Sequence, residues 1–490
     1  MFRALRLGAS LLVVAMVTTG CFAGSAAGGD DGARLRVVLP FPPAQGLSPW
    51  GDDALLLTRL GVAEPLVDLD QAGSPVPGLA ESWTRTGDTT WRIHLRAGVK
   101  FHNGAVLTAA DAANALTKAG AASPVPRALK GVGLVAVAEG DRDLVITTAK
   151  PDPVLPQRLS SPNLVILAPS AYRPDRVDPA GAATGPFVLK SPVKDVATLD
   201  AFAGYWAGAP RSPGVDVRFV PDGTTRASTL RAGEADVVYA LPVAASVDPQ
   251  RVLGVPLPRT VSLHLNTAKA PFADAGLRAA VRAAVDPATL ARGVYEGQAD
   301  AARGIYGPAS PWAPPQRELA PVPTPAAPAG QKIVLATYGD RAELPEVGSV
   351  VAETLRAKGF VVEQVVRAYS LLEPDLLAGK FDAVISSRSY LLDTGDPFAY
   401  LGTDLTCKGG YNLSGLCDRT IDTTITESAA LADPKARVAA ALKIEADVLA
   451  TGALIPLVHE RARIGVAAGV ADVPADVYER HLITKGTHRS

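Results

Sequence analysis

The stretch at 78–116, GLAESWTRTGDTTWRIHLRAGVKFHNGAVLTAADAANAL, has the clearest structural signals in the chain. From Trp91 to Arg96 apolar and polar side chains alternate, which predicts a half-buried antiparallel strand. Asn103-Gly104 marks a turn. Thr108 followed by Asp111 predicts a capped helix start. With a further strand, DLVITT, these signals predict a small β-rich module over residues 60–165.

On both sides of a central helical region the pattern changes to strands that alternate with helices. One such region begins with a strand, KIVLATY, and continues with an amphipathic helix that has Val347, Val350, Val351 and Leu355 on one side. Two further strands, FVVEQVVRAY and FDAVISS, follow the helix. The pattern A-G-x-x-D-x-V occurs at 232–238 and again at 378–384. It indicates either two unrelated helix-to-strand turns or two α/β lobes of similar build, with a ligand cleft between them.

Length and charge restrict the class of protein. A chain of 490 residues is too long for one core and predicts two or three domains. The formal net charge of −1 offers no basic surplus for nucleic acid, so we expect no nucleic-acid partner. The Pro-rich segment 306–330 is expected to be an extended connector on the surface.

The N-terminus predicts export. Arg3 and Arg6 precede an apolar run that is too short to span a bilayer and that ends in small residues before Cys21. We interpret residues 1–20 as a signal peptide and Cys21 as the acylated first residue of a lipoprotein, although Thr18 stands where Leu is more usual. Residues 21–33 would be a lipidated flexible tether. The alternative is a secreted protein cut nearby.

Cys407 and Cys417 are the two remaining cysteines. Outside the membrane thiols oxidise, so a disulfide is expected. A zinc site is the alternative, but it needs about four N or S ligands, and no His or third Cys lies close in sequence. The six histidines show no metal spacing, and we expect no metal.

Motifs for catalysis are missing from the sequence. It contains neither a G-x-x-x-x-G-K-[ST] phosphate loop nor a G-x-S-x-G elbow nor an H-E-x-x-H helix. Asp393 and Asp396 could in principle be an acid and base pair, but nothing places a substrate between them. We therefore predict that the protein is not an enzyme and needs no cofactor.

Several segments resemble one known family. Residues 78–116 and 263–299 are similar to the two long signatures of the extracytoplasmic solute-binding proteins of family 5, the dipeptide- and oligopeptide-binding receptors of ABC importers. TGPFVLK and GYWAGAP also fit. Residues 396–422, with both cysteines around Asn412, resemble the dipeptide-binding branch.

The resemblance implies an α/β, periplasmic-binding-protein-like two-lobe (Venus flytrap) fold with an additional β-rich domain. Domain I would comprise 34–59, 166–260 and 463–490. Domain II would be the module at 60–165, and domain III would cover 261–462. Two chain crossings between the lobes would form a hinge, and the lobes would close on the ligand.

The same resemblance assigns the candidate site to Ser389-Tyr390-Leu391-Leu392-Asp393. Asp393 stands on the carboxylate that takes a peptide's terminal ammonium, which would be costly to bury unpaired. Tyr390 stands where Trp is common and would stack on or wall the ligand. Ser389 to Leu391 would add main-chain hydrogen bonds. Arg388 could meet a ligand carboxylate or form a surface ion pair, and Asp396 is expected to form an Asx turn.

The sequence therefore predicts a lipid-anchored receptor on the extracytoplasmic face of a bacterial cell membrane, which captures short peptides and delivers them to the permease subunits of an ABC importer. We expect a monomer. One alternative is a non-peptide cargo such as a nickel chelate, haem or a glycolipid, none of which has the free α-ammonium that Asp393 would bind. Another is a sensor or envelope factor built on the same scaffold.

Overall fold

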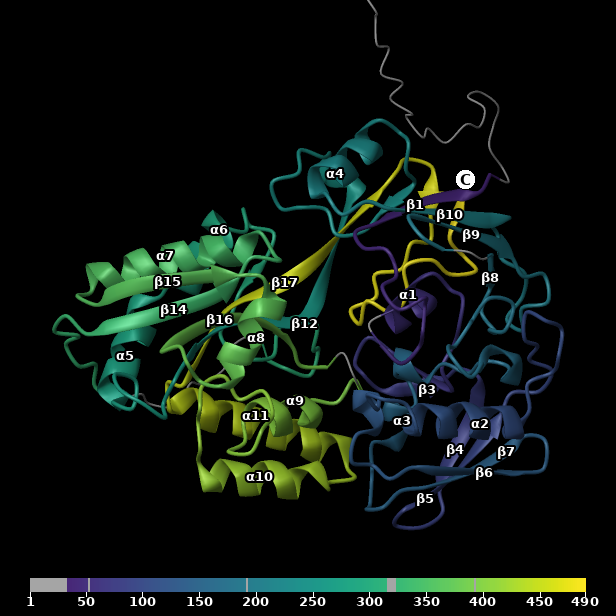
Figure 1. Ribbon diagram of the computed structural model, residues 1–490, viewed down its shortest axis with the longest axis horizontal. Helices are drawn as coiled ribbons and strands as arrows, with labels where there is room; N and C mark the ends of the chain where they lie inside the picture. The colour runs from purple at the N-terminus through teal and green to yellow at the C-terminus, as the bar shows by residue number, and fades with distance from the viewer. Residues whose placement is uncertain (1–32, 52, 191–192, 315–322, 392–393) are drawn as a thin grey trace, which may run out of the picture.

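A computed structural model describes residues 33–51, 53–190, 193–314, 323–391 and 394–490 (Figure 1). Cys21 and the signal and tether segments lie outside the described residues. Within them, a large mixed sheet of eleven strands links the two halves of the molecule. Its order is β15 (Val361–Arg367), β14 (Lys332–Tyr338), β16 (Ala383–Ser389), β12 (Val252–Leu265), β17 (Leu454–Val466), β11 (Val237–Val238), β1 (Leu35–Leu39), β10 (Gly214–Phe219), β9 (Val196–Ala201) and β8 (Phe187–Lys190), with β13 (Asp300–Ala301) paired to β17.

Two long antiparallel strands connect the halves. The first residues of β12, from Val252, pair with the last residues of β17, and the later part of β12 pairs with both β17 and β16. The register of the β12–β17 pair shifts between Pro256 and Thr260. In Figure 1 both strands run from the half that contains β1 into the half that contains β14 and β16. This is the double crossing that the resemblance implies.

The module predicted from the opening stretch is present as a four-stranded antiparallel sheet. Its order is β4 (Ala80–Arg85), β5 (Thr90–Leu95), β7 (Asp143–Thr147) and β6 (Val135–Glu139), and helices α2 (Ala109–Gly120) and α3 (Leu155–Arg158) accompany it. Trp91, Ile93 and Leu95 are buried, as the alternation predicted. The capping box forms in full, since Thr108 accepts from the Asp111 N–H and Asp111 accepts from the Thr108 N–H. A short pair, β2 (Val67–Leu69) and β3 (Pro75–Pro77), lies beside it.

Several helices of the other regions begin after an aspartate N-cap. Asp274, Asp286 and Asp433 each accept hydrogen bonds from the first turn of the helix that follows. The helices are α1 (Ala54–Arg59), α4 (Gly223–Arg231), α5 (Ala275–Ala284), α6 (Pro287–Gly293), α7 (Glu343–Ala357), α8 (Tyr369–Leu377), α9 (Phe398–Asp404), α10 (Arg419–Ala429) and α11 (Pro434–Ala450). Strands β18 (Val470–Ala471) and β19 (His488–Arg489) pair near the C-terminus.

Two sequence expectations were wrong in detail. Val350, placed on the buried side of α7, is 37% exposed, because the buried stripe runs through Val347, Val351 and Leu355. The segment predicted to lie on the surface after 306 begins in the interior instead. Tyr306 and Ala309 are 1% exposed, and the Tyr306 ring packs against Trp312 and Tyr390.

The buried side chains give the α/β part of the expected domain III a core of its own, and the three-domain division stays a proposal. One apolar cluster draws all its buried members from Val261–Val458, inside the expected domain III. A larger cluster joins the module, the β1 half and the helices α9 to α11. Those helices therefore pack with residues outside the α/β part of domain III, which no local sequence pattern indicated.

Candidate ligand-binding cavity

A cavity of about 580 Å³ lies between the β-rich module and helices α9 to α11. Small-molecule sites typically have volumes of about 300–1,000 Å³, so this one can hold a small ligand. Figure 1 shows α9 and α11 facing α3 across this region. One wall comes from residues 127–132, 150–154 and 158 of the module, and the other from residues between 388 and 437.

The module's wall is held together by a partly buried ion pair. Arg158 Nε donates to Asp152 Oδ2 at 2.5 Å, and Arg158 Nη1 donates to the Ala128 carbonyl at 3.2 Å. Asp152 is only 7% exposed, and its carbonyl also accepts from the indole N–H of Trp91. This arrangement ties the segment around 127–132 to the segment around 150–154.

The opposite wall contains the end of β16, where the sequence placed its candidate site. Ser389, Tyr390 and Leu391 all line the cavity. Tyr390 is 2% exposed, its hydroxyl accepts from the Gly307 N–H at 2.9 Å, and its ring meets Tyr306 edge to face at 5.2 Å between ring centroids. These contacts fit a wall residue better than a side chain free to stack on a ligand.

Part of the main chain at this wall already has internal partners. The Tyr390 N–H donates to the Pro258 carbonyl at 2.9 Å, and the Leu391 carbonyl accepts from the Gly395 N–H at 2.6 Å. A ligand adding as a strand along Ser389 to Leu391 would have to use other backbone groups than these two. Asp393, with Leu392, lies outside the described residues, and its position relative to the cavity stays a prediction.

Asp396 also lines the cavity, and its carboxylate is occupied. Its Oδ1 accepts from the Phe398 N–H at 3.0 Å, which is the expected Asx turn. The same carboxylate accepts hydrogen bonds from Nε and Nη2 of Arg437 at 2.8 to 3.0 Å. Arg437 is 6% exposed and also donates to the carbonyls of Ala429, the last residue of α10, and of Leu431. Asp396 is therefore a structural residue that joins the loop after β16 to α11.

Arg388 is not in a surface ion pair. Its Nε and Nη2 donate to the two oxygens of Asp404 at 2.6 and 2.9 Å, and Asp404 is 3% exposed. The guanidinium carbon lies 3.7 Å from the ring centroid of Tyr411. Burial alone would lower the pKa of Arg388, but the bonds to Asp404 outweigh this effect and raise it. With its carboxylate partner in place, Arg388 is a weaker candidate for holding a ligand carboxylate than the sequence suggested.

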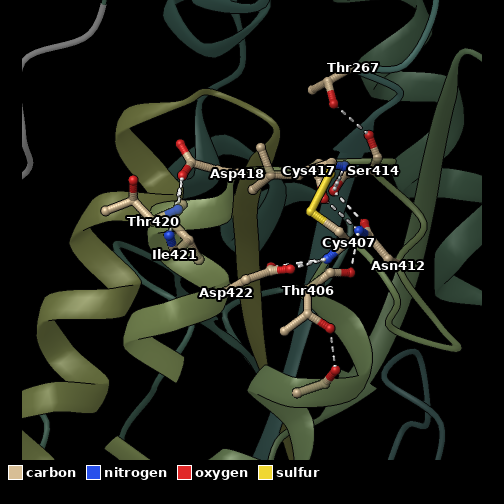
Figure 2. The surroundings of a disulfide bond; sticks show 12 residues. Thr267, Thr406, Cys407, Asn412, Ser414, Cys417, Asp418, Thr420, Ile421 and Asp422 are labelled. Atoms are coloured by element: carbon tan, nitrogen blue, oxygen red, sulfur yellow. Dashed lines mark hydrogen bonds between the residues drawn. A yellow bond between two sulfur atoms is a disulfide. The ribbon is translucent and has the colours of Figure 1, made fainter. Parts of the chain in front are cut away.

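The expected disulfide between Cys407 and Cys417 is formed in the structure, with Cα atoms 4.4 Å apart (Figure 2). Inside the loop, the Asn412 amide donates to the Thr406 and Leu416 carbonyls, and Asp422 of α10 accepts from the Cys407 N–H. The loop presents Gly410 and Tyr411 to the cavity. The disulfide loop therefore carries Tyr411, the side chain whose ring covers the Arg388 guanidinium.

A second cluster of charges lies where the two halves join. Arg259 of β12 contacts Glu460 of β17 and Glu479 of the C-terminal tail, at 3.9 and 3.4 Å. Arg341 pairs with Glu460, and Arg59 of α1 lies 3.7 Å from Glu479. Burial alone would raise the pKa of Glu479, but Arg259 and Arg59 hold it below its usual range. The cluster connects elements of both halves.

The buried histidines His264 and His459 have structural roles. His264 is 3% exposed, and burial lowers its pKa to about 3, so it is neutral at physiological pH. His459 is 5% exposed and exchanges a hydrogen bond with Thr260. Among the described residues, no group of three or more His, Cys, Asp or Glu side chains could hold a metal ion. No described helix is both long enough and apolar enough to cross a bilayer.

Sequence reasoning missed the module's share of the cavity. The cavity lining includes Arg127, at the start of a 3-10 helix (Arg127–Leu129), and Lys130 and Lys150 in turns. These residues follow no periodic pattern and are far in sequence from residues 388–398. It also missed Asp404, Tyr411 and Arg437, because only the fold brings them to β16. The turn-rich PRALKG and AKPDP segments were a weak signal, since cations in turns are usually solvated.

The chain matches the model of a known protein family. Residues 74–412 match the model of the bacterial extracellular solute-binding proteins, family 5 Middle. Because the match covers well over half of the chain, the protein belongs to this family, whose members are the solute-binding components of ABC importers. The predicted class of protein is confirmed.

Individual relatives differ in what they bind. The chain is 27% identical over 458 residues, 81% of its length and 84% of the relative's, to the probable di/tripeptide-binding protein 5 of Pseudomonas aeruginosa. It is 31% identical over 274 residues to the nickel-binding periplasmic protein of Escherichia coli, covering 51% of each chain.

Solved structures confirm the fold. The substrate-binding protein CtaP from Listeria monocytogenes superposes with a TM-score of 0.80 at 16% identity, covering 94% of this chain and 99% of that one. The two-lobe, periplasmic-binding-protein-like α/β fold is therefore that of this protein.

Proposed function

We propose that the protein captures short peptides in the cavity beside β16 and delivers them to the permease subunits of an ABC importer, while Cys21 anchors it by lipid to the extracytoplasmic face of the membrane. The observation that carries this proposal is the cavity itself. It is lined by Ser389, Tyr390 and Leu391, the residues that immediately precede the proposed ammonium-binding segment. The disulfide of the neighbouring loop fits an oxidising compartment.

A peptide cargo is supported by the relative that matches most of the chain, a probable di/tripeptide-binding protein. In the proposed complex, Asp393 accepts charge-assisted hydrogen bonds from the peptide's ammonium group, each worth about 1.5–3 kcal/mol. The nearby carboxylates of Asp396 and Asp404 already have guanidinium partners, so they are less suited to this task.

A metal chelate is the second candidate cargo, because the nickel-binding relative matches half of the chain. The described residues that line the cavity include no His and no Cys. A soft or borderline metal ion bound there would need to bring its own nitrogen or sulfur ligands. A direct metal site built from the described wall is therefore disfavoured.

Thermal-shift measurements on the purified protein would test the proposal. We expect free peptides of two to five residues to raise the melting temperature, and N-acetylated versions of the same peptides to leave it unchanged. The panel should include Ni²⁺ with free histidine as the chelate arm. Stabilisation by the nickel arm alone, or equal stabilisation by acetylated and free peptides, would contradict the peptide-receptor proposal.

A further inference from the structure

The charges that line the cavity do not balance among the described residues. Three of its cations have carboxylate partners at short distance, namely Arg388 with Asp404, Arg437 with Asp396 and Arg158 with Asp152. Lys130 and Lys150 also line the cavity, and neither has a carboxylate within ion-pair distance in the described part of the chain. Both lysines belong to the module's wall. Arg127 lines the same wall and is not without a partner, so the positive surplus is assigned to the two lysines.

The chain segments that carry the two lysines lie side by side. The Ala149 N–H donates to the Val132 carbonyl at 2.9 Å, and the Thr148 hydroxyl donates to the Lys150 carbonyl at 2.6 Å. Gly133 has a φ of +61°, and a Cβ atom there would lie 2.7 Å from the Ala149 methyl group. The two chain segments can approach this closely only with glycine at that position.

This placement has an electrostatic consequence for any ligand in the cavity. A lysine ammonium that faces water is well solvated, so its charge has little free-energy cost. A ligand that fills the cavity displaces part of that water. Both lysines are exposed in this structure, and the removal of that water strengthens the attraction between the ammonium groups and a negative ligand group. A ligand that carries a second carboxylate besides its C-terminal one gains from this arrangement, whereas the amide isostere loses water from its side chain without gaining that attraction.

We infer that Lys130 and Lys150 form an anion-selective subsite on the β-rich module, which gives the protein a preference for peptides with an acidic side chain after the first residue. This inference rests on the proposed peptide function. It assigns to the module, and not only to the two lobes, a part in choosing the cargo. The chemistry that it recognises is the carboxylate, whether on a peptide side chain or on a small polycarboxylate.

Calorimetric titration with two matched dipeptides tests this inference. Alanyl-glutamate and alanyl-glutamine have the same shape and differ by one charge. We expect the acidic peptide to bind about tenfold more tightly at low salt, with the ratio falling as salt screens the charges. In the Lys130→Gln/Lys150→Gln double variant the ratio should approach one. Lys118→Gln, an exposed lysine of the module on α2 outside the cavity lining, is the matched control and should keep the wild-type ratio.

Failure of the inference and failure of the peptide proposal give different results. If both dipeptides bind equally well to the wild type, or if the double variant keeps the tenfold ratio, the lysine subsite is refuted while peptide capture stands. If neither dipeptide binds but citrate does, and the double variant loses citrate binding, the peptide proposal fails and the carboxylate subsite stands. If neither dipeptide nor citrate binds, both are refuted.

Discussion

Asp393 and Asp396, three residues apart, are assigned different roles. Asp396 is 9% exposed, starts an Asx turn and neutralises the buried Arg437. It cannot take a ligand ammonium without releasing that guanidinium, which would leave a charge buried without a partner. Asp393 is the carboxylate that we propose for the ligand. The two residues can therefore be distinguished by what their replacement damages.

We expect Asp396→Asn to destabilise the protein by about 3–5 kcal/mol, because the Arg437 charge would lose its counter-ion in the interior. Asp393→Asn should leave the free energy of unfolding within about 0.5 kcal/mol of the wild type and abolish stabilisation by free peptides. Denaturant unfolding with and without peptide measures both effects.

Each of these two variants is the control for the other. A large loss of stability in Asp393→Asn with peptide binding retained would reverse the two roles. If Asp396→Asn kept full stability, the buried pair with Arg437 would have no importance for folding.

At the scale of elements, the repeated A-G-x-x-D-x-V pattern forms the same kind of helix-to-strand connection in both places. Gly233 and Gly379 have φ values of +70° and +65°, as expected for the left-handed residue after a helix. Asp236 then accepts from the Arg36 N–H, and Asp382 accepts from the Val334 N–H, each at 2.8 Å. In both halves the aspartate fastens its strand to the parallel neighbour, so the interpretation as two lobes of similar build was the better one.

The disulfide loop between α9 and α10 is the element with the most direct test. Closing a loop of about ten residues contributes roughly 2–3 kcal/mol by the loop-entropy model. We expect the Cys407→Ser/Cys417→Ser variant to lose about this amount in denaturant unfolding. Because the loop presents Tyr411 to Arg388, the variant should also bind peptides more weakly.

Treatment of the wild type with a thiol reductant provides the matched comparison without a mutation. It should reproduce the stability loss and leave the serine variant unaffected. An unchanged melting temperature after complete reduction, verified by mass spectrometry, would show that the bond has no stabilising role.

At the scale of the molecule, the C-terminal tail joins parts that lie far apart in the sequence. Glu479 meets Arg59 and Arg259, and Tyr239 donates its hydroxyl proton to the same carboxylate. Two residues further on, His481 lies 3.0 Å from Asp476 and 3.4 Å from Asp68 of β2 in the module. The tail therefore contacts the module, α1 and the crossing strand β12.

The His481 contacts predict a pH dependence of stability. Burial of the ring lowers its pKa, but Asp476 and Asp68 outweigh burial and the nearby Arg480, so the pKa of His481 is raised. A raised histidine pKa adds stability that is fully present below the unfolded value of about 6.5 and is lost as the pH rises through the folded value. The difference in melting temperature between wild type and His481→Gln should therefore be largest near pH 6 and shrink as the pH rises through the raised pKa of the folded state.

Asp68→Asn is the companion variant for this measurement. It removes the partner on the module, keeps Asp476, and should reduce the pH dependence without abolishing it. A difference between wild type and His481→Gln that is the same at every pH would mean that the protonated ring contributes nothing beyond packing.

The candidate site was predictable only in part. The resemblance located Ser389 to Leu391, and the structure places all three at the cavity wall. The partners of Arg388 and Asp396 were not predictable, because Asp404 and Arg437 come to them through packing of helices that no local pattern orients. The same holds for Lys130 and Lys150, which lie more than two hundred residues away in sequence from the opposite wall.

The amino-acid sequence alone determined the local structure and the class of protein: the alternating strand at Trp91, the capping box at Thr108 and the family signatures. These signals depend on neighbours within a few residues, where backbone geometry and capping chemistry act. Only the tertiary structure decided which charges meet one another and which charged residues line the cavity together. Electrostatic pairing depends on distance in space, and the chain brings residues 127–158 and 388–437 together only after the sheet and helices have packed.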